Sequence, residues 1–189
     1  MIIGITGTLG AGKGTVVEYL VNQKGFKHFA VSDTFLVTEA KKRGLEPTRV
    51  VRRDIANEFR AKGPTKLMEA VYEMTKEVIE RGEDVVLEPQ HTTAEVAFIQ
   101  SIGGVEFAVD ADLRTRYERI QKRGSAKDNV TFEQFEAEQK HEMASDNPNE
   151  NNLGAAIKAA DVTFQNNGTQ EELFAQVEAA LAANIKTSK

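Results

Sequence analysis

The sequence contains no cysteine and no long hydrophobic run. Without cysteine the chain can form neither a disulfide framework nor a thiolate metal site, which fits a reducing cytoplasm. The longest apolar stretches have about the length of a strand, far short of the roughly 20 residues that span a bilayer. Residues 1–6 lack a basic segment and have the pattern of a buried strand rather than a signal peptide. We therefore expect a cytoplasmic protein that makes no membrane contact.

Internal repeats, low-complexity tracts and linkers rich in proline or serine are also missing. The 189 residues, 40% hydrophobic and 28% charged, fit one domain that spans 1–189. A formal net charge of -5 argues against binding to a nucleic-acid backbone. Arginines nevertheless cluster within 43–60 and 114–123, and two local basic patches suit a small phosphorylated ligand better than a polymer.

Short apolar runs alternate with longer amphipathic segments. Strands are expected at 2–6, 28–32, 84–88, 105–110 and 161–165, and helices at about 13–23, 33–43, 48–62, 65–81, from 93, 112–123, 131–144 and 169–184. Thr131 and Gln134 form a predicted capping box, Thr169 caps the last helix, and 145–152 is expected to be a loop. This alternation predicts a parallel sheet covered on both faces, with ligands at the carboxyl ends of its strands.

The strongest functional signal lies between the first strand and the first helix. Glycines there let backbone N–H groups curl around a phosphate, and the helix N-terminus adds partial positive charge. Lys13 would reach the β- and γ-phosphates of ATP, and the hydroxyl of Thr15 would bind Mg²⁺. The predicted ATP-binding residues of this segment are Gly7, Gly10, Ala11, Gly12, Lys13, Gly14, Thr15 and Val16.

The loop has the form Gly-x-x-Gly-x-Gly-Lys-Gly-Thr, with glycine at position 14. This form resembles the loop of the adenylate kinase and nucleoside monophosphate kinase family. The resemblance implies an α/β protein with the three-layer α/β/α P-loop kinase fold, a five-stranded parallel sheet and a helical lid. It also implies an acceptor-binding region at about 33–82, a lid at about 119–145, ATP and Mg²⁺ as cofactors, and a small-molecule nucleotide as substrate. We expect a monomer or homodimer without specific nucleic-acid binding.

Further positions match the same family. Asp33 follows the second strand, as the family's aspartate does near the acceptor, and Arg43 lies near its acceptor-phosphate arginine. Arg119 and Arg123, four residues apart on one helix face, resemble the lid arginines that flank the ATP base and phosphates. Asn166-Asn167-Gly168-Thr169 resembles the loop that meets the adenine edge, so Asn166 and Gly168 join the predicted ATP site.

Residues 160–169 also resemble the end of dephospho-CoA kinases. A set of archaeal-type proteins described as adenylate-kinase-related or dephospho-CoA-kinase-like is similar through Arg43-Gly44-Leu45, Ala56-Asn57-Glu58-Phe59-Arg60 and Gly63-Pro64. These similarities extend over most of the chain in outline.

Two features of the family are missing. Many relatives have Asp-Gly-x-Arg after the third strand, where this chain has Glu88-Pro89-Gln90-His91. Glu88 still provides a carboxylate for a metal-bound water, and His91 would replace the arginine only in part. In 125–145 the cations are Lys127, Lys140 and His141, and lysine lacks the bidentate fork of arginine.

Phosphoryl transfer needs aligned reactants and neutralised charge. We assign the donor phosphates to Lys13, Mg²⁺ to Thr15 and Glu88, and closure over the transferring group to Arg119 and Arg123. Asp33 completes the predicted catalytic set because it would orient or deprotonate an acceptor hydroxyl; its alternative role is a helix N-cap. The predicted acceptor-binding residues are Asp33, Arg43, Arg60 and His91. Arg60 would otherwise pair with a neighbouring carboxylate of its helix.

Three functions fit these residues. The first is a kinase that transfers the γ-phosphate of ATP to a nucleoside monophosphate or related small nucleotide. The second is a hydroxyl kinase similar to dephospho-CoA kinase, favoured by residues 160–169 and by the missing Asp-Gly-x-Arg. The third is a nucleotide-binding regulatory ATPase, which the missing lid arginines favour and the arginines at 43–60 oppose.

Overall fold

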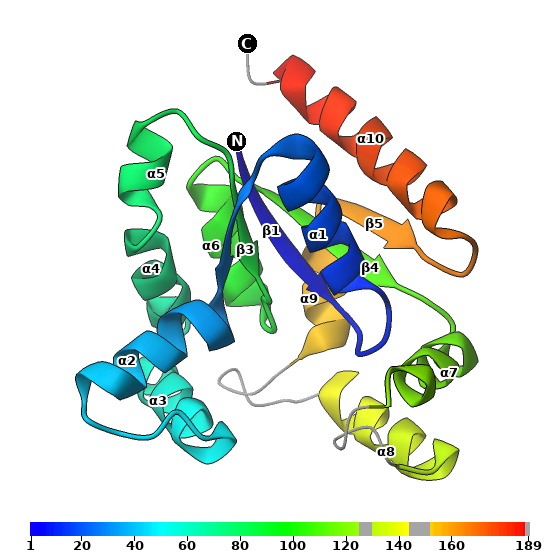
Figure 1. Ribbon diagram of the computed structural model, residues 1–189, viewed down its shortest axis with the longest axis horizontal. Coiled ribbons are helices and arrows are strands. Elements are labelled where there is room, and N and C mark those ends of the chain that lie inside the picture. The colour runs from blue at the N-terminus through cyan, green and yellow to red at the C-terminus, as the bar shows by residue number, and fades with distance from the viewer. Residues whose placement is uncertain (125–129, 144–151, 188–189) are drawn as a thin grey trace.

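The computed structural model describes residues 1–124, 130–143 and 152–187 (Figure 1). Lys127 and nearly all of the predicted loop at 145–152 lie outside them. Within the described residues the sheet has five strands in the spatial order β2-β3-β1-β4-β5, and each neighbouring pair is parallel. The strands are β1 (Ile2–Gly7), β2 (Lys27–Ala30), β3 (Val85–Glu88), β4 (Val105–Asp110) and β5 (Val162–Gln165). The predicted three-layer fold is confirmed.

Helices cover both faces of this sheet (Figure 1). They are α1 (Lys13–Lys24), the π-helical turn η1 (Val31–Leu36), α2 (Val37–Lys42), α3 (Arg49–Lys62), α4 (Lys66–Glu73), α5 (Lys76–Glu80), α6 (Thr93–Ser101), α7 (Leu113–Arg123), α8 (Phe132–Met143), α9 (Leu153–Ala159) and α10 (Gln170–Thr187). No helix of the described residues combines the length and the apolar character that a membrane crossing requires.

Successive side chains of the central strands point to opposite faces of the sheet, so the hydrophobic core consists of two clusters, one on each face. Ile3 and Ile5 of β1 face α1 and α10, where they pack with Leu20 and Val177. A second cluster, which includes Leu87 of β3, fills the space between the sheet and the helices η1 to α6. Because successive side chains of a strand point to opposite faces, β1 contributes Gly4 and Thr6 to this second side.

Several predicted boundaries are wrong. The helix expected at 65–81 is two helices, because the hydroxyl of Thr75 donates to the carbonyl of Tyr72 (2.7 Å) and the chain turns there. β2 ends at Ala30, before the expected end at 32, and η1 follows at once. Helix α9 was not predicted from the sequence; Asn152 caps it by accepting from the amide of Ala155 (3.1 Å).

The predicted caps are confirmed. The amide of Thr131 donates to Oε1 of Gln134 (2.9 Å) and the amide of Gln134 to the hydroxyl of Thr131 (3.3 Å). Thr169 and Glu172 make the same reciprocal pair at the start of α10. In each case two side chains three residues apart in the sequence accept hydrogen bonds from two backbone N–H groups at the start of the helix.

The carboxyl ends of the strands meet at one edge of the sheet. In Figure 1, α2 and α3 lie on one side of this edge and α7 and α8 lie on the other, with the loop after β1 between them. The two regions expected to bind the acceptor and to form the lid therefore flank the predicted phosphate loop.

A buried carboxyl group lies beside β1. Glu106 of β4 is fully buried, and neither of its carboxyl oxygens has a hydrogen-bond partner among the described residues. A Cβ atom on Gly4, its neighbour on β1, would lie 1.9 Å from Oε2 of Glu106, so the glycine makes room for the carboxyl group. Burial, together with the carboxylates of Asp161 and Glu95, raises the pKa of Glu106 well above its usual range.

Glu106 is therefore expected to keep its proton in the folded protein at pH values where the unfolded chain has lost it. The free energy of unfolding of the wild type should then fall, relative to that of Glu106→Gln, as the pH rises above about 4.5. The expected slope is up to about 1.4 kcal/mol per pH unit. Urea unfolding of both proteins between pH 5 and 8 measures it. A difference between the two proteins that does not change with pH would show that Glu106 is ionised in the fold.

Candidate active site

The loop between β1 and α1 carries the predicted phosphate-binding glycines. Gly10 and Gly12 have φ angles of 80° and 105°, which residues with a side chain rarely adopt. A Cβ atom on Gly12 would lie 2.4 Å from Nδ2 of Asn166, and one on Gly10 would lie 2.7 Å from the carbonyl oxygen of Arg116. Backbone conformation and the close approach of distant segments together restrict both positions to glycine.

Lys13 begins α1 and folds back over the loop. Its Nζ donates to the carbonyl oxygens of Gly7 (2.7 Å) and Thr8 (3.0 Å). Burial lowers the pKa of Lys13 from 10.5 to about 8, and the carboxylates of Glu88 and Glu142 oppose part of this shift. Because the ammonium group is poorly solvated, it gains more from a phosphate oxygen than an exposed lysine would.

A cavity of about 590 Å³ lies between the loop and α7. Lys13 and Thr15 line it from α1, Glu88 from the end of β3, and Arg119 and Arg123 from α7. This volume is typical of a small-molecule site. The structure thus brings the predicted donor-side residues to one cavity from three different elements.

Thr15 and Glu88 give this cavity a hydroxyl and a carboxylate. Oε1 of Glu88 lies 3.0 Å from Nε2 of His28, a contact that steadies the carboxylate at the end of β3. Mg²⁺ prefers oxygen ligands, and it commonly uses one or two protein groups together with phosphate oxygens and water. The two side chains therefore fit a Mg²⁺ ion that is bound with a nucleotide.

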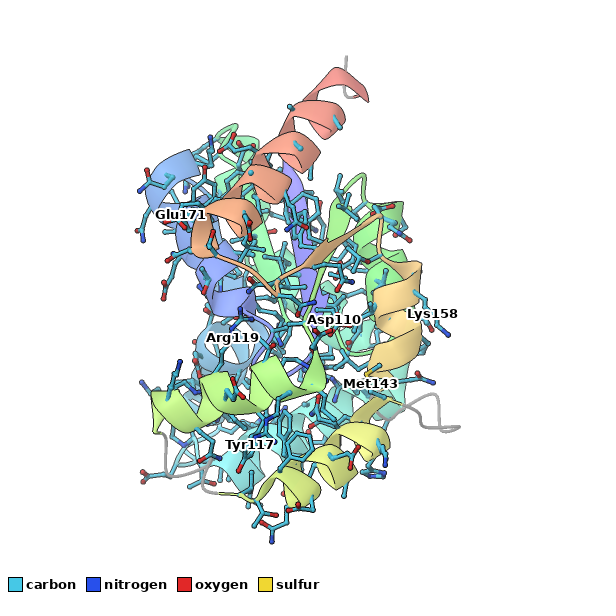
Figure 2. All side chains as sticks on the ribbon, turned by 90° about the vertical axis from the view of Figure 1, so that its right-hand side faces the viewer. Asp110, Tyr117, Arg119, Met143, Lys158 and Glu171 are labelled. Carbon is cyan, nitrogen blue, oxygen red and sulfur yellow. The ribbon has the colours of Figure 1, made fainter. Side chains whose placement is uncertain are left out.

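Arg119 links α7 to the loop after β5. Figure 2 shows it on the side of α7 toward the phosphate loop, whereas Tyr117 lies on the side toward α8. Nη1 of Arg119 donates to the carbonyl of Asn166 (2.8 Å), and Nδ2 of the buried Asn166 donates to the carbonyl of Ala11 (2.7 Å). Arg119, Asn166 and Gly168 also border a second cavity of about 170 Å³, where the sequence predicts the nucleotide base.

Arg116 is a site residue that the sequence analysis did not identify. It is buried, donates through Nε to the carbonyl of Ala111 (2.9 Å) and reaches the carbonyl of Leu9 in the phosphate loop (3.4 Å). Its Nη1 also donates to Oε1 of Gln139 on α8. Burial lowers the pKa of Arg116. Arg116 therefore joins α8 to the loop, and no spacing rule relates residues so far apart in the sequence.

Two residues of the predicted ATP set lie in the core. The side chains of Ala11 and Val16 are fully buried and belong to the cluster on the α1 side of the sheet. Only their backbone atoms remain to contact a ligand, and the amide of Val16 already donates to the carbonyl of Gly12 (3.2 Å).

Asp33 lies within η1 and does not cap it, since the turn begins at Val31. Its side chain is 81% exposed, and Oδ1 accepts from Nη1 of Arg52 on α3 (2.9 Å). The same Nη1 donates to the hydroxyl of Ser32 (2.8 Å). The segment after β2 is therefore joined to α3 by one arginine, which the sequence analysis placed only within a basic stretch.

The two arginines that were predicted to bind the acceptor, Arg43 and Arg60, also pair with carboxylates. Arg43 donates to Glu39 (2.9 Å) and to Glu58 (2.7 Å) at the protein surface. Arg60 donates through Nε and Nη2 to Oε1 of Glu95 (both 3.3 Å), whose side chain is 1% exposed. The sequence predicts acceptor binding or an ion pair within α3 for Arg60, but the observed partner belongs to α6. Neither arginine lines the large cavity.

His91 is half-buried beside this ion pair. Its amide donates to Oε2 of Glu95 (2.8 Å). Burial and the cations of Arg60 and Lys13 lower the pKa of His91 to about 3. The imidazole is therefore neutral near pH 7 and would offer a ligand a hydrogen bond without a charge.

Comparison with known proteins agrees with this geometry. A family model described as an AAA domain matches residues 3–141. The UPF0200 protein of Sulfurisphaera tokodaii is 32% identical over 184 residues and covers 95% of each chain. The dephospho-CoA kinase from Campylobacter jejuni has a TM-score of 0.58 at 14% identity, covering 100% of this chain and 98% of its own. Shikimate kinase from Aquifex aeolicus has a TM-score of 0.56 at 17% identity and covers 98% of both chains. These two likenesses show the fold.

The lowered pKa of Lys13 predicts how ATP binding depends on pH. The affinity for ATP without Mg²⁺ should be constant below pH about 8 and should fall up to tenfold per pH unit above it, because Lys13 then loses its proton. Fluorescence titration with a labelled ATP between pH about 7.5 and 9.5 measures the bend. Glu88→Gln removes a carboxylate that raises the pKa of Lys13, so the bend should move to lower pH.

Lys13→Ala serves as the control for this profile. It should bind ATP more weakly and show no bend in this range. If Lys13→Ala and the wild type had parallel pH profiles, a group other than Lys13 would be responsible.

Proposed function

This chain belongs to the AAA domain family and to the UPF0200 proteins, and we propose that it is an ATP-dependent phosphotransferase, because shikimate kinase and dephospho-CoA kinase share its fold. The proposed reaction moves the γ-phosphate of ATP to a nucleoside monophosphate or a related small nucleotide. The observation that supports it most is the cavity that Lys13, Arg119 and Arg123 line together at the carboxyl edge of the sheet. A phosphoryl group that develops negative charge needs cations on more than one side.

On the donor side, the loop amides and Lys13 hold the β- and γ-phosphates of ATP. Arg119 and Arg123 reach the transferring group from α7, and the base lies near Asn166 and Gly168. Mg²⁺, when bound to Thr15 and Glu88 together with the nucleotide, supplies further neutralisation of the phosphate charge. The lack of cysteine and the acidic net charge favour action in the cytoplasm on small molecules.

On the acceptor side, Asp33, Arg43, Arg60 and His91 are the candidates around α2 and α3. Asp33 is exposed and can reorient, so it suits the task of holding an acceptor hydroxyl. Burial, Arg60 and Lys13 together lower the pKa of His91, so its imidazole carries no charge near pH 7. A neutral imidazole there can donate or accept a hydrogen bond beside the group that receives the phosphate.

A hydroxyl kinase similar to dephospho-CoA kinase is the second candidate. It is favoured by the corner formed by His91, Arg60 and Glu95, where the imidazole is neutral and the arginine is already paired with a buried carboxylate. Because this group of residues offers an acceptor no unpaired positive charge, it suits a neutral hydroxyl better than a second phosphate. A regulatory ATPase stays the third candidate, because residues 130–143 contain no arginine to close over an acceptor.

An acceptor panel tests the proposal. ADP release from ATP and Mg²⁺ is measured with AMP, CMP, UMP, GMP, the deoxynucleotides and dephospho-CoA. One acceptor should raise turnover at least tenfold above the rate without acceptor. A monophosphate that does so supports a nucleotide kinase, and dephospho-CoA supports the hydroxyl kinase. The same slow hydrolysis with every compound would favour the regulatory ATPase.

Lys13→Ala should lose turnover by a factor of a hundred or more with the fold intact, because its ammonium group is the buried cation of the donor site. Lys122→Ala is the matched control, since Lys122 is an exposed lysine of α7. Circular dichroism and thermal melts of both variants establish folding. Wild-type turnover of Lys13→Ala at saturating ATP would exclude the proposed donor site.

A further inference from the structure

Among the arginines of the proposed acceptor region, Arg43, Arg52 and Arg60 pair with carboxylates of a different helix or turn, and they differ in what holds them. Arg43 pairs with two carboxylates, Arg60 pairs with one buried carboxylate, and Arg52 pairs with one exposed carboxylate. An arginine can bind a ligand anion only if its own partner can leave without a large cost. The exposure of each partner therefore decides which arginine is available.

Arg60 cannot change partner. Glu95 is 1% exposed and is also bonded to the amide of His91. If Arg60 turned to a ligand, it would leave the Glu95 charge buried without its cation, which is strongly unfavourable. Arg60 therefore belongs to the structure of the site, where it neutralises Glu95.

Arg43 is surrounded by an excess of negative charge. Its guanidinium group donates to Glu39 on α2 and to Glu58 on α3, so two carboxylates share one cation. Both bonds raise the pKa of Arg43. An anion that approached this arginine would meet a net negative cluster.

Arg52 has a replaceable partner. The side chain of Asp33 is 81% exposed, so this carboxylate can turn into water at little cost. Ser32 shares Nη1 of Arg52 and can itself donate a hydrogen bond to an oxyanion. Nε of Arg52 is buried and has no acceptor among the described residues, so the present position does not satisfy the whole guanidinium group.

The position of this group fits an acceptor site. Ser32 follows β2 by two residues, and Ala30 of β2 pairs with Glu88 of β3, which lines the large cavity. Neighbouring strands lie about 4.8 Å apart. Arg52 therefore holds the chain at the carboxyl edge of the sheet, next to the strand that carries Glu88.

We propose that Arg52 and Ser32 bind a phosphate group of the acceptor, with Asp33 displaced from the arginine. This inference rests on the proposed function and assigns the acceptor to phosphate-bearing small molecules. It selects Arg52 over Arg43 and Arg60 as the arginine that recognises the acceptor.

A binding comparison tests the assignment without relying on turnover. Calorimetry measures the affinity for AMP, CMP, UMP and GMP against their nucleosides, and for dephospho-CoA against adenosine. The wild type should prefer at least one phosphate-bearing ligand, and Arg52→Gln should reduce that preference roughly ten- to a hundredfold, as the loss of a charged hydrogen bond implies. Arg52→Lys should retain part of it. Arg81→Gln, the same change at an exposed arginine that pairs with Glu83 and has no place in the proposed site, should leave it unchanged.

Two results would overturn the assignment. One is a wild type that binds every phosphate-bearing ligand no better than its counterpart, and the other is a folded Arg52→Gln protein that keeps the wild-type preference. Kinetics separate this inference from the proposed function. If the preference for phosphate-bearing ligands depends on Arg52 but no acceptor raises ADP release, the proposed phosphotransferase function is wrong. If turnover depends on an acceptor and Arg52→Gln leaves its KM unchanged, the Arg52 site is wrong.

Discussion

The phosphate loop depends on hydrogen bonds that its carbonyl oxygens accept from side chains. Lys13 bonds to the first two carbonyls, Arg116 reaches that of Leu9, and Asn166 bonds to that of Ala11. With these carbonyls bonded to cations and an amide, an anion would meet the backbone N–H groups of the loop, as in other phosphate-binding nests. The amide of Ala11 is the exception, since it already donates to the carbonyl of Thr8 (3.2 Å). The donor residues come from α1, α7 and the loop after β5, so the packing of these elements sets the geometry of the loop.

Charge is distributed differently on the two sides of the loop. On the α7 side, Arg119 and Arg123 line the same cavity as Lys13, so cationic groups converge there. On the α3 side, every arginine discussed here is compensated by a carboxylate, and His91 is neutral. This distribution fits the proposed function, in which the triphosphate donor carries more charge than the acceptor.

Local features could be predicted from the sequence, and contacts between distant segments could not. The glycine loop, the five strands, the capping box at Thr131 and the N-cap at Thr169 each depend on a few consecutive residues, and the structure confirms them. The contacts of Arg60 with Glu95 and of Arg116 with Gln139 depend on how helices pack, which no local spacing encodes.

The turn at Thr75 and the helix α9 were not predicted from the sequence for a similar reason. The hydroxyl of Thr75 competes with the backbone where the periodic pattern continues, and α9 is a short helix stabilised by burial of Leu153 and Ala156. Predicted roles for Arg43, Arg60 and His91 likewise depended on where their side chains point. Residue type suggested a charge at each position, but only the fold shows which charges are already paired and which imidazole is neutral.

The contact between Asn166 and Ala11 has a consequence for how the protein is made. The two residues are 155 positions apart, and β5, which carries Asn166 into place, is the last strand of the sheet. A chain emerging from the ribosome therefore contains the whole glycine loop long before it contains the amide that supports it. The phosphate loop can be completed only after the chain has been synthesised through β5 and Asn166, and β5 has joined β4. Premature termination anywhere before that strand would leave a product with the sequence motif and without the assembled site.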